Sequence, residues 1–402
     1  MTSAQRAVLP TAYWKQWSAS LISNLGDGVN FVAMPLLALS MTQDERLLAL
    51  VAMATMLPWL LVALPVGVLV DRADRRRLMI GANLVRVALF AQIAAAATVA
   101  GLTIWMLVAV LLVVGVCEVV FDSTAQAFLP MIVPGNQLER ANGLLFAAEV
   151  IAGSIVGLSV GALLFDVDAG LPFASNAASF AVAAAILATV RVARRDGAER
   201  SPTERIDLRS GLSWLAEHEV LRVLAVMFTV TNLGLMFGQG IFAKYVVDVL
   251  GLDSLGFGLL LAITAMGAAT GGLLGSRVVG RIGLRNAVVA PYVAFGIAQF
   301  VIAAAPPAWV VGVAGFGMGV GITVWNVATV TVRQRLIPGN QFGRVNGIYR
   351  WLGAAASAAG IGLGGLVAHA TNLQVPYVVG GTITVVAAAL FGKPVLRGLA
   401  DA

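Results

Sequence analysis

An internal repeat constrains this chain more than any other feature of its sequence. The stretch VPGNQLERANG, from Val133 to Gly143, returns 204 residues later as IPGNQFGRVNG, from Ile337 to Gly347. Seven of the eleven positions are identical, and they include a proline, an arginine and two asparagines. Both copies run in the same direction along the chain, which predicts two halves built on one duplicated unit.

Long apolar runs divide equally between the two halves. The chain is 59% apolar and 11% charged, with a mean hydropathy of +0.90, which excludes an ordinary soluble domain. A bilayer core of about 30 Å needs roughly 20 apolar residues per helix. Twelve such runs cover residues 14–39, 47–70, 78–100, 104–124, 141–165, 171–190, 220–246, 255–278, 287–305, 310–332, 345–368 and 375–390. We therefore predict an all-α membrane protein with twelve transmembrane helices in two pseudo-symmetric six-helix bundles, residues 1–190 and 220–402, joined by a cytoplasmic linker, residues 191–219.

The basic residues predict the orientation of these helices. With a cytoplasmic N-terminus, only Arg46 and Lys244 of the 26 Lys and Arg residues fall on the outer side. The others lie in cytoplasmic segments or, like Arg86 and Arg350, at the inner ends of helices, as the positive-inside rule requires. The net charge of +6 thus reflects topology, and nucleic acid is not a predicted partner. We expect a multi-pass protein of the bacterial cytoplasmic membrane, surrounded by the lipid bilayer, with both termini in the cytoplasm.

The end of the linker carries leucines at helical spacing. Leu208, Leu212 and Leu215, with Trp214 beside them, fit an amphipathic helix that lies along the inner membrane surface. The alternative interpretation is a solvated linker with a single helical turn.

Four acidic residues lie at membrane depth, where an ionisable group is a functional candidate by default. One of them, Asp122, has Asn326 as its counterpart in the repeat and is expected to be structural. Asp27 is about halfway along the first predicted helix, and Ser23 and Asn30 extend it into a polar stripe. Its counterpart in the repeat is Leu235, so the duplicated fold does not need an acid there. Glu149 and Glu118 have the counterparts Gly353 and Ile322, and the same argument applies to them. Burial disfavours the charged form of a carboxyl group, so we predict proton coupling at Asp27 first, then Glu149 and Glu118.

Several polar and aromatic residues are candidates for a substrate cavity. They are Asn24 and Asn30 in the first helix, Asn232, Met236 and Gln239 on one face of the seventh, and Trp325 and Asn326 in the tenth. Ordinary packing between helices is the alternative role for each of them.

The loop after the second predicted helix reads GVLVDRADRRR, from Gly67 to Arg77. It resembles the loop signature of the major facilitator superfamily, with Gly67, Asp71, Arg72, Arg75 and Arg76 in place. Asp74 stands where the usual second glycine is expected. A degraded copy, SRVVGRIGLR from Ser276 to Arg285, occurs in the second half.

The resemblance implies a cytoplasmic gate at this loop. Gly67 would let helix 2 pack closely on a neighbour, and Asp71 would face the N-terminus of helix 11, where negative charge is favoured. Asp122, at the inner end of helix 4, is the expected partner of Arg72 or Arg76. The alternative is a basic loop that sets topology without gating.

Within the superfamily, the chain resembles the bacterial twelve-helix proton-coupled drug and siderophore exporters. The stretches FDSTAQAFLPMIVPGNQLERANG from Phe121 and RQRLIPGNQFGRVNGIYRWLG from Arg333 are typical of them. Export-type members carry a glycine–proline pair in helix 5, but here Leu158 occupies the proline position. Glycines at every fourth residue predict tight helix interfaces: Gly153, Gly157 and Gly161 in helix 5, and Gly267, Gly271 and Gly275 in helix 8.

No catalytic motif, metal-ligand pair or phosphate loop accompanies these features, so we predict neither an enzyme nor a metal or cofactor. The resemblance implies a monomeric secondary transporter that works by alternating access between its halves. Our leading hypothesis is proton-coupled efflux of lipophilic, cationic small molecules. The alternative is export of a siderophore or lipid-like metabolite, without ion coupling. A membrane-embedded enzyme lacks its catalytic set, and the gate signature argues against a non-transporting sensor.

Overall fold

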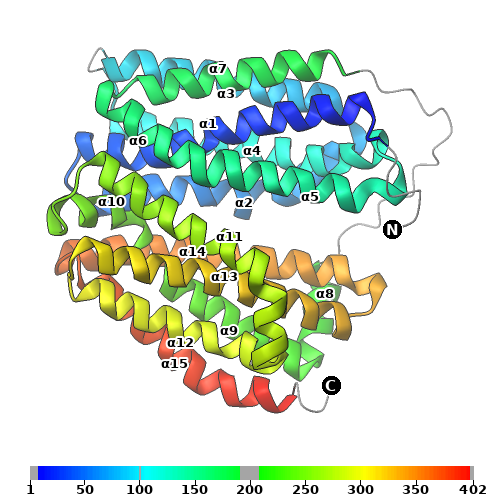
Figure 1. Cartoon of the computed structure of the whole chain (residues 1–402), viewed down its shortest axis with the longest axis vertical. Helices are drawn as coiled ribbons and strands as arrows, with labels where there is room; N and C mark the ends of the chain where they lie inside the picture. Colours follow the sequence, from blue (N-terminus) through cyan, green and yellow to red (C-terminus); the bar gives the residue numbers. More distant parts are fainter. Residues whose placement is uncertain (1–7, 99–100, 191–207, 399–402) are drawn as a thin grey trace. The chain divides into compact units, whose positions relative to one another are not determined.

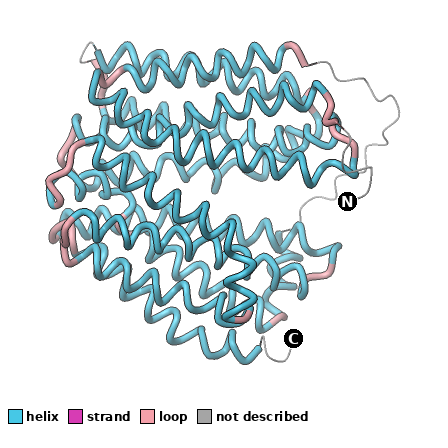
Figure 2. The backbone as a smooth tube through the Cα atoms, viewed as in Figure 1, coloured by secondary structure: helices cyan, strands magenta, loops and turns pink. Residues whose placement is uncertain are grey.

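The structure is a computed structural model that describes residues 8–98, 101–190 and 208–398. Within these ranges the chain forms helices joined by short loops and contains no strand (Figure 2). Twelve of the described helices are long and apolar enough to cross a membrane. Each predicted apolar run overlaps one of these spans, so the prediction of an all-α protein with twelve transmembrane helices is confirmed.

The chain divides into two compact units. The first comprises residues 1–41 and 58–203, and the second comprises residues 42–57 and 204–402. The boundary at Pro58 falls inside a continuous helix, α2 (Glu45–Arg72), which therefore contributes residues to both units.

The first unit contains the helices of the first repeat (Figure 1). Besides the later part of α2 they are α1 (Thr11–Met41), α3 (Arg75–Thr98), α4 (Ile104–Ile132), a short η2 (Gly135–Gln137), α5 (Leu138–Ala148), η3 (Glu149–Gly157), α6 (Leu158–Val167) and α7 (Leu171–Ala188). The predicted fifth membrane helix is thus built from α5, η3 and α6, and η3 is π-helical. A π-helical turn is often found at functional sites, and this one begins at Glu149.

Close backbone contacts hold α1 against the fifth membrane helix. A Cβ atom added to Gly28 would lie 2.0 Å from the carbonyl oxygen of Gly153, and one added to Gly161 would lie 2.5 Å from that of Val29. The tight interface predicted from the glycines of helix 5 is therefore confirmed. On the other side of the unit, α3 and α7 run side by side, and Phe90 stacks on Phe180 between them.

The second unit contains the helices of the second repeat. They are α8 (Leu208–Glu217), α9 (Glu219–Met236), η4 (Gln239–Ile241), α10 (Phe242–Lys244), η5 (Tyr245–Val249), α11 (Ser254–Ile282), α12 (Leu284–Ala303), α13 (Ala308–Leu336), α14 (Gly339–Ala370) and α15 (Val375–Gly398). The predicted seventh membrane helix is broken here into α9, η4, α10 and η5. Irregular backbone at membrane depth is tolerated only where protein buries it or it lines a cavity.

Small residues also bring α11 and α13 together. A Cβ atom on Gly267 would lie 2.1 Å from the carbonyl oxygen of Phe316, and one on Gly271 would lie 2.7 Å from that of Val320. At Gly275 the nearest atom is a Val327 methyl carbon at 3.7 Å, an ordinary contact. The predicted stripe is thus confirmed at its first two glycines, whereas the third packs normally.

The structure describes two of the predicted cytoplasmic features, the glycine of the loop signature and the helix at the end of the linker. A Cβ atom on Gly67 would meet no described atom within 4 Å, and the expected close packing of helix 2 on a neighbour at Gly67 stays a prediction. The linker helix α8 does form and runs for ten residues. Its Leu215 is buried against Leu221 and Tyr349, whereas Leu212 is exposed. Its position on the membrane surface stays a prediction.

Candidate functional site

The three predicted proton-coupling acids come together in the first unit. Asp27 from α1 lies beside Arg86 from α3, with 4.0 Å between Oδ1 and Nη1. Glu118 from α4 interacts electrostatically with both Asp27 and Arg86. Glu149, at the start of η3, interacts in the same way with Asp27. Residues far apart in the sequence therefore form one ionisable cluster, which we call the Asp27 cluster: Asp27, Arg86, Glu118 and Glu149.

Arg86 is the buried member of this cluster, with 1% of its surface exposed. Its Nη2 donates to Oδ1 of Asn83 at 2.7 Å. Its guanidinium carbon lies 4.1 Å from the ring centre of Phe180 and 4.9 Å from that of Phe121. Aromatic faces attract a cation and exclude water from it. These contacts fix the guanidinium behind Asp27.

Asp27 is accessible where Arg86 is not. Its side chain is 42% exposed, compared with 2% for that of Arg86, and it also accepts a hydrogen bond from Ser23. A proton or a cationic molecule can therefore reach the carboxylate from its open side. Because Asp27 and Glu118 both interact with this guanidinium and Glu149 interacts with Asp27, ionising all three carboxyl groups leaves excess negative charge at membrane depth, which is unfavourable. The cluster is chemically suited to hold and release protons.

Two arginines of the loop signature donate hydrogen bonds to backbone carbonyls of other helices in the same unit. Nη1 of Arg75 donates to the carbonyl oxygen of Ala127 in α4 at 3.1 Å. Nε of Arg76 donates to that of Leu187 at 2.9 Å, and its Nη2 donates to Ala188. Carbonyls at a helix C-terminus lack intrahelical donors and carry partial negative charge, so Arg76 caps α7.

The remaining gate residues are less engaged. Asp74, at the position of the expected glycine, accepts from the backbone N–H of Arg77 at 3.0 Å and caps the start of α3. Arg72 is exposed, and the side chain of Asp71 lies outside the described part of the chain. Asp122 interacts electrostatically with Glu118. Two predicted contacts stay predictions. They are the pairing of Asp122 with Arg72 or Arg76 and the contact of Asp71 with helix 11.

Several predicted cavity residues take part in helix packing. Nδ2 of Asn232 donates to the carbonyl oxygen of Gly353 and to Oγ of Ser357, each at 2.8 Å, and so joins α9 to α14. The Cβ atom of Met236 would lie 2.9 Å from a Cβ on Gly360. Trp325 stacks on Phe228 with 5.3 Å between ring centres. For these three residues the packing interpretation has direct support.

The other cavity candidates are more open or lack a partner. Gln239 and Asn326 are exposed. Asn24 and Asn30 are half-buried, and Oδ1 of Asn30 has no hydrogen-bond partner among the described residues.

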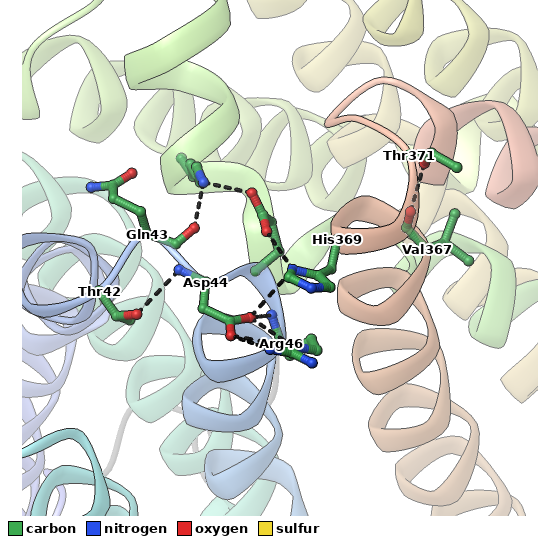
Figure 3. Close-up of polar contacts among 9 residues, drawn as sticks. Thr42, Gln43, Asp44, Arg46, Val367, His369 and Thr371 are labelled. Atoms are coloured by element: carbon green, nitrogen blue, oxygen red, sulfur yellow. Dashed lines mark hydrogen bonds and ion pairs between the residues drawn. The ribbon is translucent and has the colours of Figure 1, made fainter.

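A second charged cluster lies in the second unit, where α2, α10 and α14 meet (Figure 3). Nζ of Lys244 donates to Oε1 of Glu45 at 2.5 Å and to the carbonyl oxygen of Gln43. Nδ1 of His369 lies 3.3 Å from Oε2 of Glu45 and 3.6 Å from Oδ1 of Asp44. We call Asp44, Glu45, Arg46, Lys244 and His369 the Glu45 cluster.

Arg46 completes this cluster. Its Nη2 donates to Oδ2 of Asp44 at 2.7 Å, and this hydrogen-bonded guanidinium holds the pKa of the Asp44 carboxyl well below its usual range. Ligand atoms of Asp44, Glu45 and His369 lie within 4.8 Å of one another, a spacing that suits a metal ion. Both carboxylates, however, already accept from Arg46 and Lys244, so a metal would have to displace two cations. Arg46 and Lys244 are also the two basic residues that the sequence predicts to lie on the outer side of the membrane.

Comparison with known proteins places this geometry in a family. The family described as "Transmembrane secretion effector", part of the major facilitator superfamily, matches residues 7–400. The chain belongs to this family. It is therefore a membrane transporter and not an enzyme, and the resemblance inferred from the loop signature is confirmed.

Named relatives of the transporter include drug efflux proteins. Multidrug efflux pump Tap of Mycolicibacterium fortuitum is 28% identical over 375 residues, which cover 89% of this chain and 90% of Tap. Macrolide efflux protein A of Streptococcus pyogenes is 24% identical over 274 residues, 67% of this chain and 66% of the relative. The crystal structure of the nucleoside transporter NupG superposes with a TM-score of 0.78 at 12% identity, covering 95% and 98% of the two chains. This last likeness shows a shared fold.

Sequence reasoning found the acids of the transporter but missed their cation. From the sequence, Arg86 is expected at the inner end of its helix, where it would only set the topology. Because α3 begins at Arg75, Arg86 is three turns into the helix, about 16 Å along its axis. A basic residue at that depth is itself a signal for a charged partner. His369 and Lys244 were missed because their partners in α2 are distant in sequence.

Proposed function

We propose that this transporter exports lipophilic, cationic small molecules across the bacterial cytoplasmic membrane in exchange for protons. The observation that carries the proposal is the convergence of Asp27 and Glu118 on Arg86, with Glu149 interacting with Asp27 and with Asp27 on the open side. Drug efflux by the relatives Tap and macrolide efflux protein A, as their names state, supports the direction and the cargo.

In the proposed cycle Asp27 exchanges a proton for the substrate. Protonation from the outside neutralises the carboxyl group and removes the attraction for a cation, so the substrate leaves. Loss of the proton to the cytoplasm restores the negative charge, which attracts the next cationic molecule. Arg86 holds the carboxylate in place throughout, and Glu118 and Glu149 supply alternative positions for the proton.

Access to the site alternates as the two halves rock against each other. The loop residues Gly67, Asp71, Arg72, Arg75, Arg76 and Asp122 form the cytoplasmic gate in this proposal. The bonds from Arg75 and Arg76 to α4 and α7 support it, because they hold the loop at a fixed place on the first unit. The transporter works as a monomer with both termini in the cytoplasm.

The test is transport of a fluorescent lipophilic cation into proteoliposomes under an imposed pH gradient. Native protein should show gradient-driven transport. The transport rate of Asp27→Asn should be at least about tenfold lower, which corresponds to a barrier change of about 1.4 kcal/mol. This variant should still bind the dye. Asp248→Asn, which removes an exposed acid of the second unit, is the matched control and should transport normally. Transport by the native protein that is independent of pH gradient would contradict the proposal. Full transport by Asp27→Asn would move the coupling role to Glu118 or Glu149.

A further inference from the structure

The break in the seventh membrane helix lies beside a small cavity of the second unit. Between Met236 and Phe242 the chain passes through the short turn η4. The cavity has a volume of about 110 Å³, and its wall includes Gly238, Gln239, Phe242, Thr264, Gln299 and Tyr377. That volume equals roughly four water molecules at about 30 Å³ each, whereas pockets for a whole drug-sized molecule are about 300 Å³ or more. The cavity therefore suits one chemical group of a larger compound.

One polar side chain of the wall is buried without a hydrogen-bond partner among the described residues. Gln299, from α12, is 2% exposed, and neither its Oε1 nor its Nε2 has a hydrogen-bond partner among the described residues. A buried amide without partners is unfavourable. A Cβ atom on Gly380 would lie 2.4 Å from Oε1, so the absence of a side chain at Gly380 makes the room that this amide occupies.

Two other polar groups of the wall are already engaged within the fold, whereas the wall residue Gln239 is exposed. Oγ1 of Thr264 donates to the carbonyl oxygen of Leu260 at 3.0 Å. The hydroxyl of Tyr377 donates to the carbonyl oxygen of Gly238 at 3.2 Å. Gln299 thus presents a donor and an acceptor side by side in a wall that is otherwise largely apolar.

The chemistry of this wall selects a neutral ligand group. Among the described residues, no acidic or basic side chain lines the cavity, so an ionised group placed there would lose its hydration without compensation. A primary carboxamide or a carbamate offers an acceptor and a donor that match Nε2 and Oε1 of Gln299. Leu260, Ile302 and Met318 in the same wall can contact an apolar body attached to it.

We propose that this cavity is a subsite for a carboxamide or carbamate group of the transported compound, and that Gln299 is the residue that recognises it. The inference rests on the proposed efflux function for its physiological meaning. It narrows the substrate class to lipophilic molecules that carry a neutral hydrogen-bonding group in addition to the cation.

Direct binding of small probes tests the subsite without any transport step. Purified full-length protein in detergent is titrated with 4-fluorobenzamide and, separately, with 4-fluorotoluene, and binding is followed by fluorine NMR line broadening. We expect saturable binding of the benzamide to the native protein, weakened about tenfold or more by Gln299→Leu, as the loss of hydrogen bonds to the amide predicts. Gln92→Leu, which removes an exposed glutamine from α3 in the first unit, should bind like the native protein.

Gln299→Leu removes a polar group that has no partner among the described residues, so this variant should still fold. If it does not fold, Gln299→Met serves as the second variant. Equal benzamide binding by native protein and Gln299 variants would overturn the proposal. So would equal binding of benzamide and toluene, or no binding of either probe. Failure of proton-driven transport with intact, Gln299-dependent benzamide binding would contradict the proposed function and leave the subsite standing.

Discussion

Replacing Gly28 by alanine should both destabilise the first unit and disturb its ionisable cluster. Gly28 follows Asp27 in α1 and faces Gly153, four residues after Glu149 in the fifth membrane helix. The new Cβ atom would lie 2.0 Å from the carbonyl oxygen of Gly153. An ordinary carbon–oxygen contact is about 3.3 Å, so the two helices must separate by about 1.3 Å.

The size of the effect follows from what the new methyl group would meet. Overpacking in a well-packed interface costs about 1–3 kcal/mol. Because the obstructing atom belongs to the backbone, it cannot rotate away as a side chain could, so we expect about 3 kcal/mol, the upper end of that range. The same separation moves Asp27 away from Glu149, and proton-driven transport should fall together with stability.

The chain supplies its own reporter for this measurement. Cys117 is its only cysteine and is buried in the first unit, so reaction with a thiol-reactive dye follows unfolding during a thermal or denaturant ramp. Gly143→Ala is the matched control, because a Cβ atom there would meet no described atom within 4 Å. That variant should be neutral or slightly more stable, as alanine favours a helix over glycine by about 1 kcal/mol. If the free energy of unfolding of Gly28→Ala lies within about 0.5 kcal/mol of that of the native protein, the packing argument is refuted.

Three further predictions concern the charged contacts. Lys244→Met should destabilise the second unit by about 2 kcal/mol because it leaves the half-buried Glu45 without its cation; adding Glu45→Gln should restore most of this, as a double-mutant cycle of denaturant unfolding would show. The lowered pKa of Asp44 keeps this carboxylate ionised, with its contribution lost only below about pH 4. The loss of stability below about pH 4 should be smaller in Asp44→Asn than in the native protein, and a stability–pH profile that this variant leaves unchanged would contradict the reasoning. Arg76→Ala should cost about 1–2 kcal/mol by uncapping α7, measured by the same thiol assay; no loss would show that water replaces the arginine.

Features that depend on local composition could be predicted from the sequence. The apolar runs are long enough to identify every membrane span, and comparison of the repeats separated Asp27 from the residues that the fold itself requires. The glycine spacing identified the interface of the fifth membrane helix with α1, because only small residues allow two backbones to approach so closely.

Features that depend on the folded register could not be predicted in this way. Arg86 has the same sequence signature as a topological arginine, and only the start of α3 at Arg75 brings it level with Asp27. No proline marks the π-helical turn at Glu149, so nothing local predicts it. The break around Gln239 has only the flanking Gly238 and Gly240 as a local signal.

The unequal distribution of charge between the two repeats has a consequence for how such a protein can change. Asp27, Glu118 and Glu149 all lie in the first copy, and the second copy has Leu235, Ile322 and Gly353 at the matching positions. On the proposed function, the ancestral duplication has thus left energy coupling in one copy. Substitutions in the other copy, such as those around Gln299, can alter which compounds are accepted without touching an ionisable residue of the Asp27 cluster. Selection by a new toxic compound can therefore act on half of the gene while the proton exchange stays intact.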